Sequence, residues 1–249
     1  KKFDIEKLIK LNAKKQYITA ILNMYLESLS KRNLKDSLRS IYLKYKNYFN
    51  AKSYEILYSI LKDKNILLEL ANNFPSSEIV YKSINELKLS QLTKAQILYY
   101  NEKYKDLIEQ IQPESALYFY VDALSKLSDF KKASEICKNY KNTNFKKSDY
   151  FFECALNLLE YGDTITAFEF IDSLYEYNPY IAVRLGGYNA IVSKRYDLFF
   201  NTLKDTLIGE VQFMKALVYY VKRDYINTII TLEKIPKITN DNFEISRAY

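Results

Sequence analysis

The 249-residue chain is 48% apolar, which is enough to supply a hydrophobic core, and it carries a formal net charge of +7. It has no histidine, the commonest general base and metal ligand, and its two cysteines alone cannot build a zinc site of Cys and His ligands. The composition therefore argues against most hydrolase mechanisms, and we expect a non-enzymatic protein without metal or cofactor.

Positive charge is concentrated in the first fifth of the chain. Residues 1–50 contain twelve Lys or Arg and four Asp or Glu, a net +8, whereas residues 51–249 carry a net −1. Residues 4–12 are predicted to form a short helix with apolar residues between lysines. Two interpretations are open. Either residues 1–50 are helices that cap a helical array, or they bind an anionic membrane surface or nucleic acid through Lys7, Lys10, Lys14 and Lys15.

Helical periodicity dominates the rest of the chain and predicts an all-α protein. All four prolines lie where a helical pattern stops, and no sustained apolar/polar alternation predicts a strand. The helices expected in the first half are 16–30, 34–47, 51–61, 66–74, 76–87, 93–101 and 104–111.

The clearest pattern is the stretch 148–179, which predicts one helix-turn-helix unit. Apolar residues recur three and four positions apart up to Leu159, and Gly162-Asp163 then breaks the run. A second helical pattern continues to Asn178-Pro179. An offset of 34 residues relates this stretch to the preceding one, since it superposes Asp129 on Asp163 and Ala133 on Ala167.

A period near 34 residues with two helices per unit resembles the tetratricopeptide repeat. The resemblance covers residues 88–236 and, more loosely, 16–75. It implies a right-handed superhelix of antiparallel helix pairs, an α-solenoid, with residues 1–50 capping repeats that occupy 51–249 in one domain. Small residues of that family, which let paired helices approach closely, correspond here to Ala155, Ala167, Gly187 and Ala216. Departures from its pattern are Val121, Phe199 and Thr228.

In that family the first helices of successive repeats line the concave binding surface. The register places there Tyr118, Phe119, Asp122, Phe152, Leu156, Arg184, Tyr188, Phe213, Leu217 and Tyr220. The chaperone-binding members clamp a peptide carboxylate with basic side chains, which this largely aromatic set lacks. We therefore expect the partner to be an apolar helix or extended segment of another protein, rather than nucleic acid or a small molecule. The alternative is that this aromatic stripe belongs to the core.

The two cysteines are expected to lie close together. Cys137 falls late in a second helix and Cys154 falls in the next first helix, places that commonly pack across a repeat boundary. Either they are two buried small hydrophobic residues, or they form a disulfide, which would indicate an oxidising compartment.

Location and process are expectations from composition. The first residue is lysine rather than methionine, which is compatible with removal of an upstream signal peptide or anchor, and the abundance of Lys, Ile, Asn and Tyr is typical of an AT-rich bacterial genome. These features favour a periplasmic or membrane-associated location, with the cytoplasm as the alternative.

The leading functional hypothesis is a scaffold that binds and stabilises a protein partner, in bacterial cell-envelope assembly. One alternative is a module associated with nucleic acid or a membrane surface through the basic amino terminus. Another is a helical enzyme that uses carboxylates such as Glu153 and Glu160.

Overall fold

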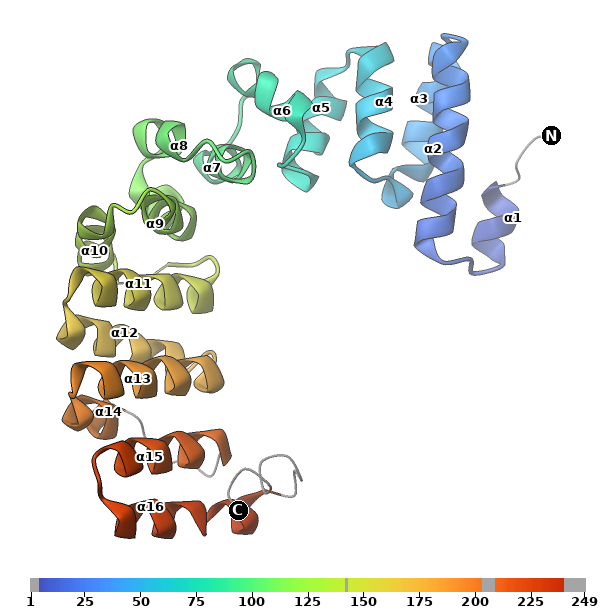
Figure 1. The fold of residues 1–249 in the computed structure, drawn as a ribbon. Helices are drawn as coiled ribbons and strands as arrows, with labels where there is room; N and C mark the ends of the chain where they lie inside the picture. Colours follow the sequence, from blue (N-terminus) through green and yellow to red (C-terminus); the bar gives the residue numbers. More distant parts are fainter. Residues whose placement is uncertain (1–4, 142, 203–208, 240–249) are drawn as a thin grey trace. The chain divides into compact units, whose positions relative to one another are not determined.

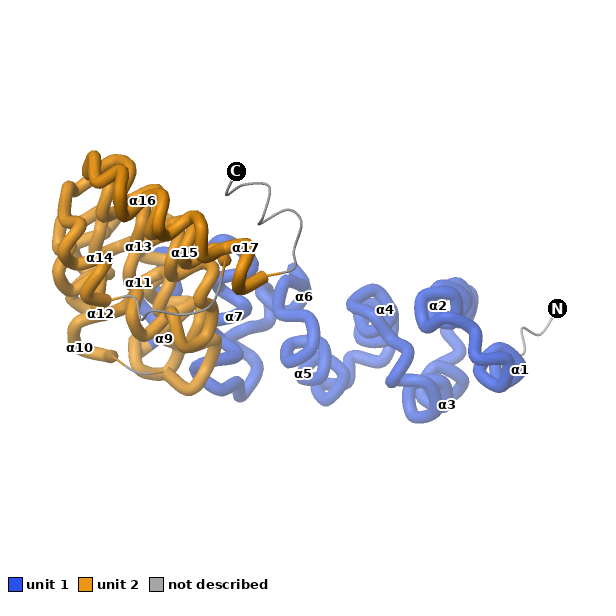
Figure 2. Tube along the Cα trace, turned by 90° about the horizontal axis from the view of Figure 1, so that it is seen from below, with its two compact units in different colours: residues 1–111 blue, residues 112–249 orange. Residues whose placement is uncertain are grey.

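The computed structural model describes residues 5–141, 143–202 and 209–239 (Figure 1). Throughout these residues the regular structure is helical and no strand occurs, which confirms the all-α prediction for the described part of the chain. The chain divides into two compact units, residues 1–111 (unit 1) and residues 112–249 (unit 2), coloured separately in Figure 2.

Unit 1 is built from short helices that pack mainly on their neighbours in sequence. Its α-helices are α1 (Ile5–Lys10), α2 (Lys15–Lys31), α3 (Lys35–Tyr45), α4 (Ala51–Leu61), α5 (Lys64–Asn73), α6 (Glu78–Lys82), α7 (Gln91–Tyr100) and α8 (Tyr104–Gln110). The helix α2 contacts α1, α3 and α4, and α4 also contacts α5. Fully buried leucines, Leu22, Leu26, Leu38 and Leu57 among them, form the core between these helices.

One predicted helix of unit 1 is interrupted. The pattern over residues 76–87 predicts a single helix, but α6 ends at Lys82 and a 3-10 helix follows at Ile84–Glu86. The backbone amide of Ser83 donates to the carbonyls of Ile79 and Val80, which closes the last turn of α6. Apolar spacing continues across this break, because Val80 and Ile84 are both buried.

Unit 2 is a succession of helices that lie side by side in chain order (Figure 1). They are α9 (Leu117–Lys126), α10 (Phe130–Asn139), α11 (Lys147–Tyr161), α12 (Thr164–Tyr175), α13 (Pro179–Ser193), α14 (Tyr196–Thr202), α15 (Gly209–Val221), α16 (Tyr225–Leu232) and α17 (Ile235–Ile238). The helix α11 packs on both α10 and α12, α13 packs on α12 and α15, and α15 packs on α16. The predicted break at Gly162-Asp163 is confirmed. The second helical pattern, predicted to continue to Asn178-Pro179, ends at Tyr175, and α13 begins at Pro179.

The same turn joins three helix pairs of unit 2. In each turn one residue has a left-handed backbone, and the aspartate after it donates its amide hydrogen to the carbonyl five residues earlier, which satisfies the end of the first helix. The aspartate carboxylate then accepts from the amide three residues later and caps the second helix. These turns are Ser128-Asp129, Gly162-Asp163 and Arg223-Asp224.

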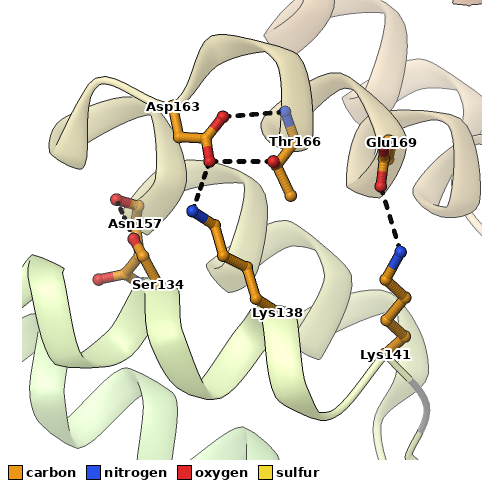
Figure 3. A network of polar contacts seen from close by, with 7 residues as sticks. All are labelled: Ser134, Lys138, Lys141, Asn157, Asp163, Thr166 and Glu169. Atoms are coloured by element: carbon orange, nitrogen blue, oxygen red, sulfur yellow. Dashed lines mark hydrogen bonds and ion pairs between the residues drawn. The ribbon is translucent and has the colours of Figure 1, made fainter.

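One face of α10 is bound to the helix pair that follows it (Figure 3). The Ser134 hydroxyl donates to the backbone carbonyl of Asn157 over 3.1 Å, and Lys138 Nζ lies 2.6 Å from Asp163 Oδ2. Between them a disulfide joins Cys137 in α10 to Cys154 in α11, and both residues are fully buried. Of the two interpretations of the cysteines, the structure therefore shows the disulfide.

The helices α13 and α15 approach each other closely at Gly187. A Cβ atom on this residue would clash with the Cγ atom of Met214 and would lie only 2.5 Å from the Sδ atom of the same side chain. A Cβ on the neighbouring Gly186 would be in ordinary contact with α12, 3.4 Å from Ile171 and 3.5 Å from Phe168. A side chain larger than glycine at position 187 would therefore meet α15, whereas the sequence pattern predicts that Gly187 lets the two helices of one pair approach.

Candidate functional site

The predicted binding residues of unit 2 differ in accessibility. Arg184, Tyr188 and Tyr220 are exposed, and Phe119 and Asp122 are buried. The remaining five are half-buried, namely Tyr118, Phe152, Leu156, Phe213 and Leu217. The exposed residues of the set therefore lie on α13 and α15.

Phe119 and Asp122 are enclosed by neighbouring elements. The Phe119 ring packs 5.1 Å from Tyr118 and 5.8 Å from Phe145, measured between centroids. Asp122 is 4% exposed, and its carboxylate lies 3.7 Å from Lys126 Nζ one turn later in α9. Neither side chain offers surface to a partner, so the prediction that Phe119 and Asp122 contact one directly does not agree with their burial.

A cation–π contact links the start of α11 to α9. Lys146 Nζ lies 4.6 Å from the centroid of Tyr118 and 5.6 Å from that of Phe119. Lys146 can reach them because it is the N-cap residue of α11 in a left-handed backbone conformation. Sequence reasoning missed this residue, since nothing in its neighbourhood marks a left-handed position.

Tyr188, an exposed aromatic residue of α13, lies near an ion pair between α13 and α15. Arg184 Nε donates to Glu210 Oε1 over 2.8 Å, and the Glu210 side chain is only 4% exposed while that of Arg184 is 57% exposed. The hydrogen bond to Glu210 and the charge of that carboxylate, with a smaller effect of Tyr188, raise the pKa of Arg184. Arg184 is thus held as a fixed cation next to Tyr188. Glu210 was not predicted, because the pairing depends on the packing of α13 on α15.

Glu153 in α11 is a carboxyl group of unit 2 whose pKa is strongly raised. Its pKa is raised to about 7, mainly by burial and also by the nearby carboxylates of Asp122 and Asp149, against an opposing effect of Lys126. Ionising this group in the folded chain is therefore unfavourable over the pH range between its usual value and neutrality.

Replacing Glu153 with glutamine should change how stability depends on pH. A raised pKa stabilises the folded chain fully below the usual value of 4.5, and this contribution is lost as the pH rises toward 7. The stability of Glu153→Gln relative to the unchanged chain should therefore be greater at about pH 8 than at about pH 5. Urea unfolding of both proteins measures this, with the exposed Glu160→Gln as the matched control. An equal difference at both pH values for Glu153→Gln would contradict the burial of this carboxyl group.

In unit 1 a pocket of about 660 Å³ includes two of the predicted lysines. Its lining residues are Lys14, Lys15, Gln16, Thr19, Ala20, Asn23 and Asn50. Asn23 Nδ2 donates to Asn50 Oδ1 over 3.2 Å, so these amides already bond to each other. Lys7 and Lys10 are exposed on α1 and do not line the pocket.

Two kinds of site are not found in the described residues. Among them no group of three or more His, Cys, Asp or Glu side chains is placed to hold a metal ion. Within the same residues no helix has the length and apolar character to cross a membrane.

Comparisons of the whole chain with protein-family models, with curated proteins and with solved structures gave no match.

Proposed function

We propose that the chain is a non-enzymatic scaffold that binds and stabilises a protein partner, and that its helix pairs form an α-solenoid similar to tetratricopeptide-repeat proteins. The sequential packing of the unit 2 helices and the recurrence of one turn at Asp129, Asp163 and Asp224 support the solenoid. A lone helix pair cannot bury its apolar face, and each pair of such an array does so against the next.

The exposed tyrosines of α13 and α15 are the observation that carries the binding proposal. Tyr188 is 61% exposed and Tyr220 is 59% exposed, and Tyr188 lies on the same helix as the anchored Arg184. Tyrosine and arginine are enriched among the residues that dominate protein interfaces, because they offer large contact area with few rotatable bonds or a rigid set of donors. The partner is a protein segment with an apolar face.

The disulfide supports the proposed location of the protein in the cell envelope. Disulfides persist in oxidising compartments and are rare in a reducing cytosol. The Cys137–Cys154 bond therefore favours action in the bacterial cell envelope, where scaffolds of this kind would assist assembly of exported proteins.

Capture of the partner from extracts of the source organism tests the proposal. Immobilised wild-type chain should retain a partner, and Tyr188→Ala and Tyr220→Ala should each lower the retained amount about tenfold, a loss typical of residues that anchor an interface. Tyr161→Ala is the matched control, because Tyr161 is 47% exposed and lies at the end of α11, outside the predicted set. Equal retention by all four proteins, or retention of none by wild type, would contradict the proposed binding face.

A further inference from the structure

The pocket of unit 1, called here the α2 pocket, lies along the first half of α2. Residues three and four apart share one face of a helix, and four such residues of α2 line the pocket: Gln16, Thr19, Ala20 and Asn23. Asn50, the N-cap residue of α4, belongs to the same lining. The volume of about 660 Å³ is that of a small-molecule site, since such sites measure about 300–1,000 Å³.

The two lysines of the α2 pocket have no counter-ion among the described residues. Residues 5–50 contain three carboxylates, and each is already in an ion pair: Glu6 with Lys44, Glu27 with Lys52 and Asp36 with Arg39. Lys14 and Lys15 belong to no ion pair of the described chain, and the pocket lining contains no acidic side chain. Their positive charge therefore favours a negatively charged ligand.

A buried amide group of the α2 pocket keeps one hydrogen unused. Asn23 is only 9% exposed, and its Nδ2 carries two hydrogens but has one acceptor in the described chain, Oδ1 of Asn50. The Oδ1 atom of Asn23 accepts from the Ser53 hydroxyl, which fixes the orientation of the amide. A buried donor without an acceptor costs free energy, so an oxygen atom of a ligand at this place would be stabilising.

The first turn of α2 supplies further donors. Lys14 is the N-cap residue but makes no side-chain capping hydrogen bond, and the backbone amides of Lys15 and Gln16 have no acceptor among the described residues. An uncapped helix start carries partial positive charge and suits an anion. The start of α4 differs, because the Asn50 side chain caps it. The negative group of a ligand is therefore expected at the α2 end of the pocket.

We propose that the α2 pocket binds a phosphate monoester, with the phosphate beside Lys14 and Lys15 and the ester group extending along α2 toward Asn23. A phosphate monoester carries a charge of about −1.5 to −2 near neutral pH, which matches two ammonium groups better than the single charge of a carboxylate. Its oxygens can accept from the lysines and from the first-turn amides together. The unused hydrogen of Asn23 favours an ester group with a hydroxyl or carbonyl oxygen. This site lies within unit 1 and does not depend on the binding face proposed for α13 and α15.

Calorimetric titration of the whole chain with glycerol 3-phosphate tests the proposal. At low salt the dissociation constant should be about 1 mM or lower, and glycerol should not bind. The double variant Lys14→Gln and Lys15→Gln should raise the dissociation constant at least about tenfold. Lys7→Gln with Lys10→Gln is the matched control, because it removes the same charge from α1 outside the pocket. It should leave the dissociation constant unchanged.

Vesicles distinguish a lipid headgroup from a soluble phosphate ester. Phosphatidylcholine vesicles that contain phosphatidic acid present a phosphate monoester, and vesicles that contain phosphatidylglycerol present an anionic diester. Sedimentation of the chain with the phosphatidic acid vesicles alone, and its loss in the Lys14 and Lys15 double variant, would assign the site to a lipid. Binding of glycerol 3-phosphate without binding of either vesicle would assign it to a soluble compound.

Nuclear magnetic resonance of the unchanged chain keeps the test decisive if the lysine variants do not fold. Glycerol 3-phosphate should shift the side-chain amide signal of Asn23. It should not shift that of Asn101, whose Nδ2 already donates to the carbonyls of Pro75 and Ile97. The proposal would be overturned by an unshifted Asn23 signal, by no binding of glycerol 3-phosphate or of either vesicle, or by equal losses in the two double variants.

Discussion

Replacing Gly187 with alanine should lower the free energy of unfolding of unit 2 by about 2 kcal/mol, a typical cost of overpacking a close contact. The added Cβ would have to displace the buried Met214 side chain of α15. This loss of stability is expected although alanine is more favourable than glycine in a helix by about 1 kcal/mol. Urea unfolding followed by circular dichroism measures it.

Gly186→Ala is the matched control for this prediction. Its Cβ would meet Ile171, Phe168 and Phe199 at 3.4–3.6 Å, which is ordinary packing distance. The variant should therefore be as stable as wild type or more stable by up to about 1 kcal/mol, the gain in helix propensity. Equal effects of the two alanines would show that α13 and α15 do not approach at Gly187.

Removal of the disulfide should lower the free energy of unfolding by about 3 kcal/mol, the entropy cost expected for a loop of this size. The bond closes a sequence separation of 17 residues between α10 and α11. The double variant Cys137→Ala and Cys154→Ala should unfold at lower denaturant concentration than the oxidised chain, and reductant should not change its midpoint.

Thiol titration provides the check on this prediction. The unfolded wild-type chain should show no free thiol without reductant and two after reduction, because Cys137 and Cys154 are its only cysteines. Two reactive thiols in the chain purified without reductant would contradict the disulfide, whatever the stability of the double variant.

The helices and most of their breaks could be predicted because local sequence dictates them. The aspartates at the three turns of unit 2 both end the preceding helix and cap the next. The sequence shows the first two of them, Asp129 and Asp163, 34 residues apart. The break at Ser83 was missed because the apolar spacing from Val80 to Ile84 is that of a continuous helix.

The accessibility of the ten predicted binding residues could be predicted only in part, because burial depends on how many elements surround a helix. The helix α9 contacts α10, α11 and the 3-10 helix Pro113–Ser115, so seven of its ten residues are buried, Phe119 and Asp122 among them. Helical spacing alone cannot show this, since it identifies one apolar face and not a second neighbour. The Arg184–Glu210 pair was missed for a related reason, because it joins residues of two helices whose packing no local pattern reveals.

The proposed scaffold is tested most directly by the footprint of its partner on the chain. Hydroxyl-radical labelling compares the side-chain accessibility of the chain alone with that of the chain bound to the captured protein. Tyr188 and Tyr220, both exposed in the free chain, should be protected in the complex, and Tyr161 should be labelled equally in both states. Unchanged labelling of Tyr188 and Tyr220, with protection of Tyr17 on the basic amino-terminal helices instead, would contradict a binding face on α13 and α15.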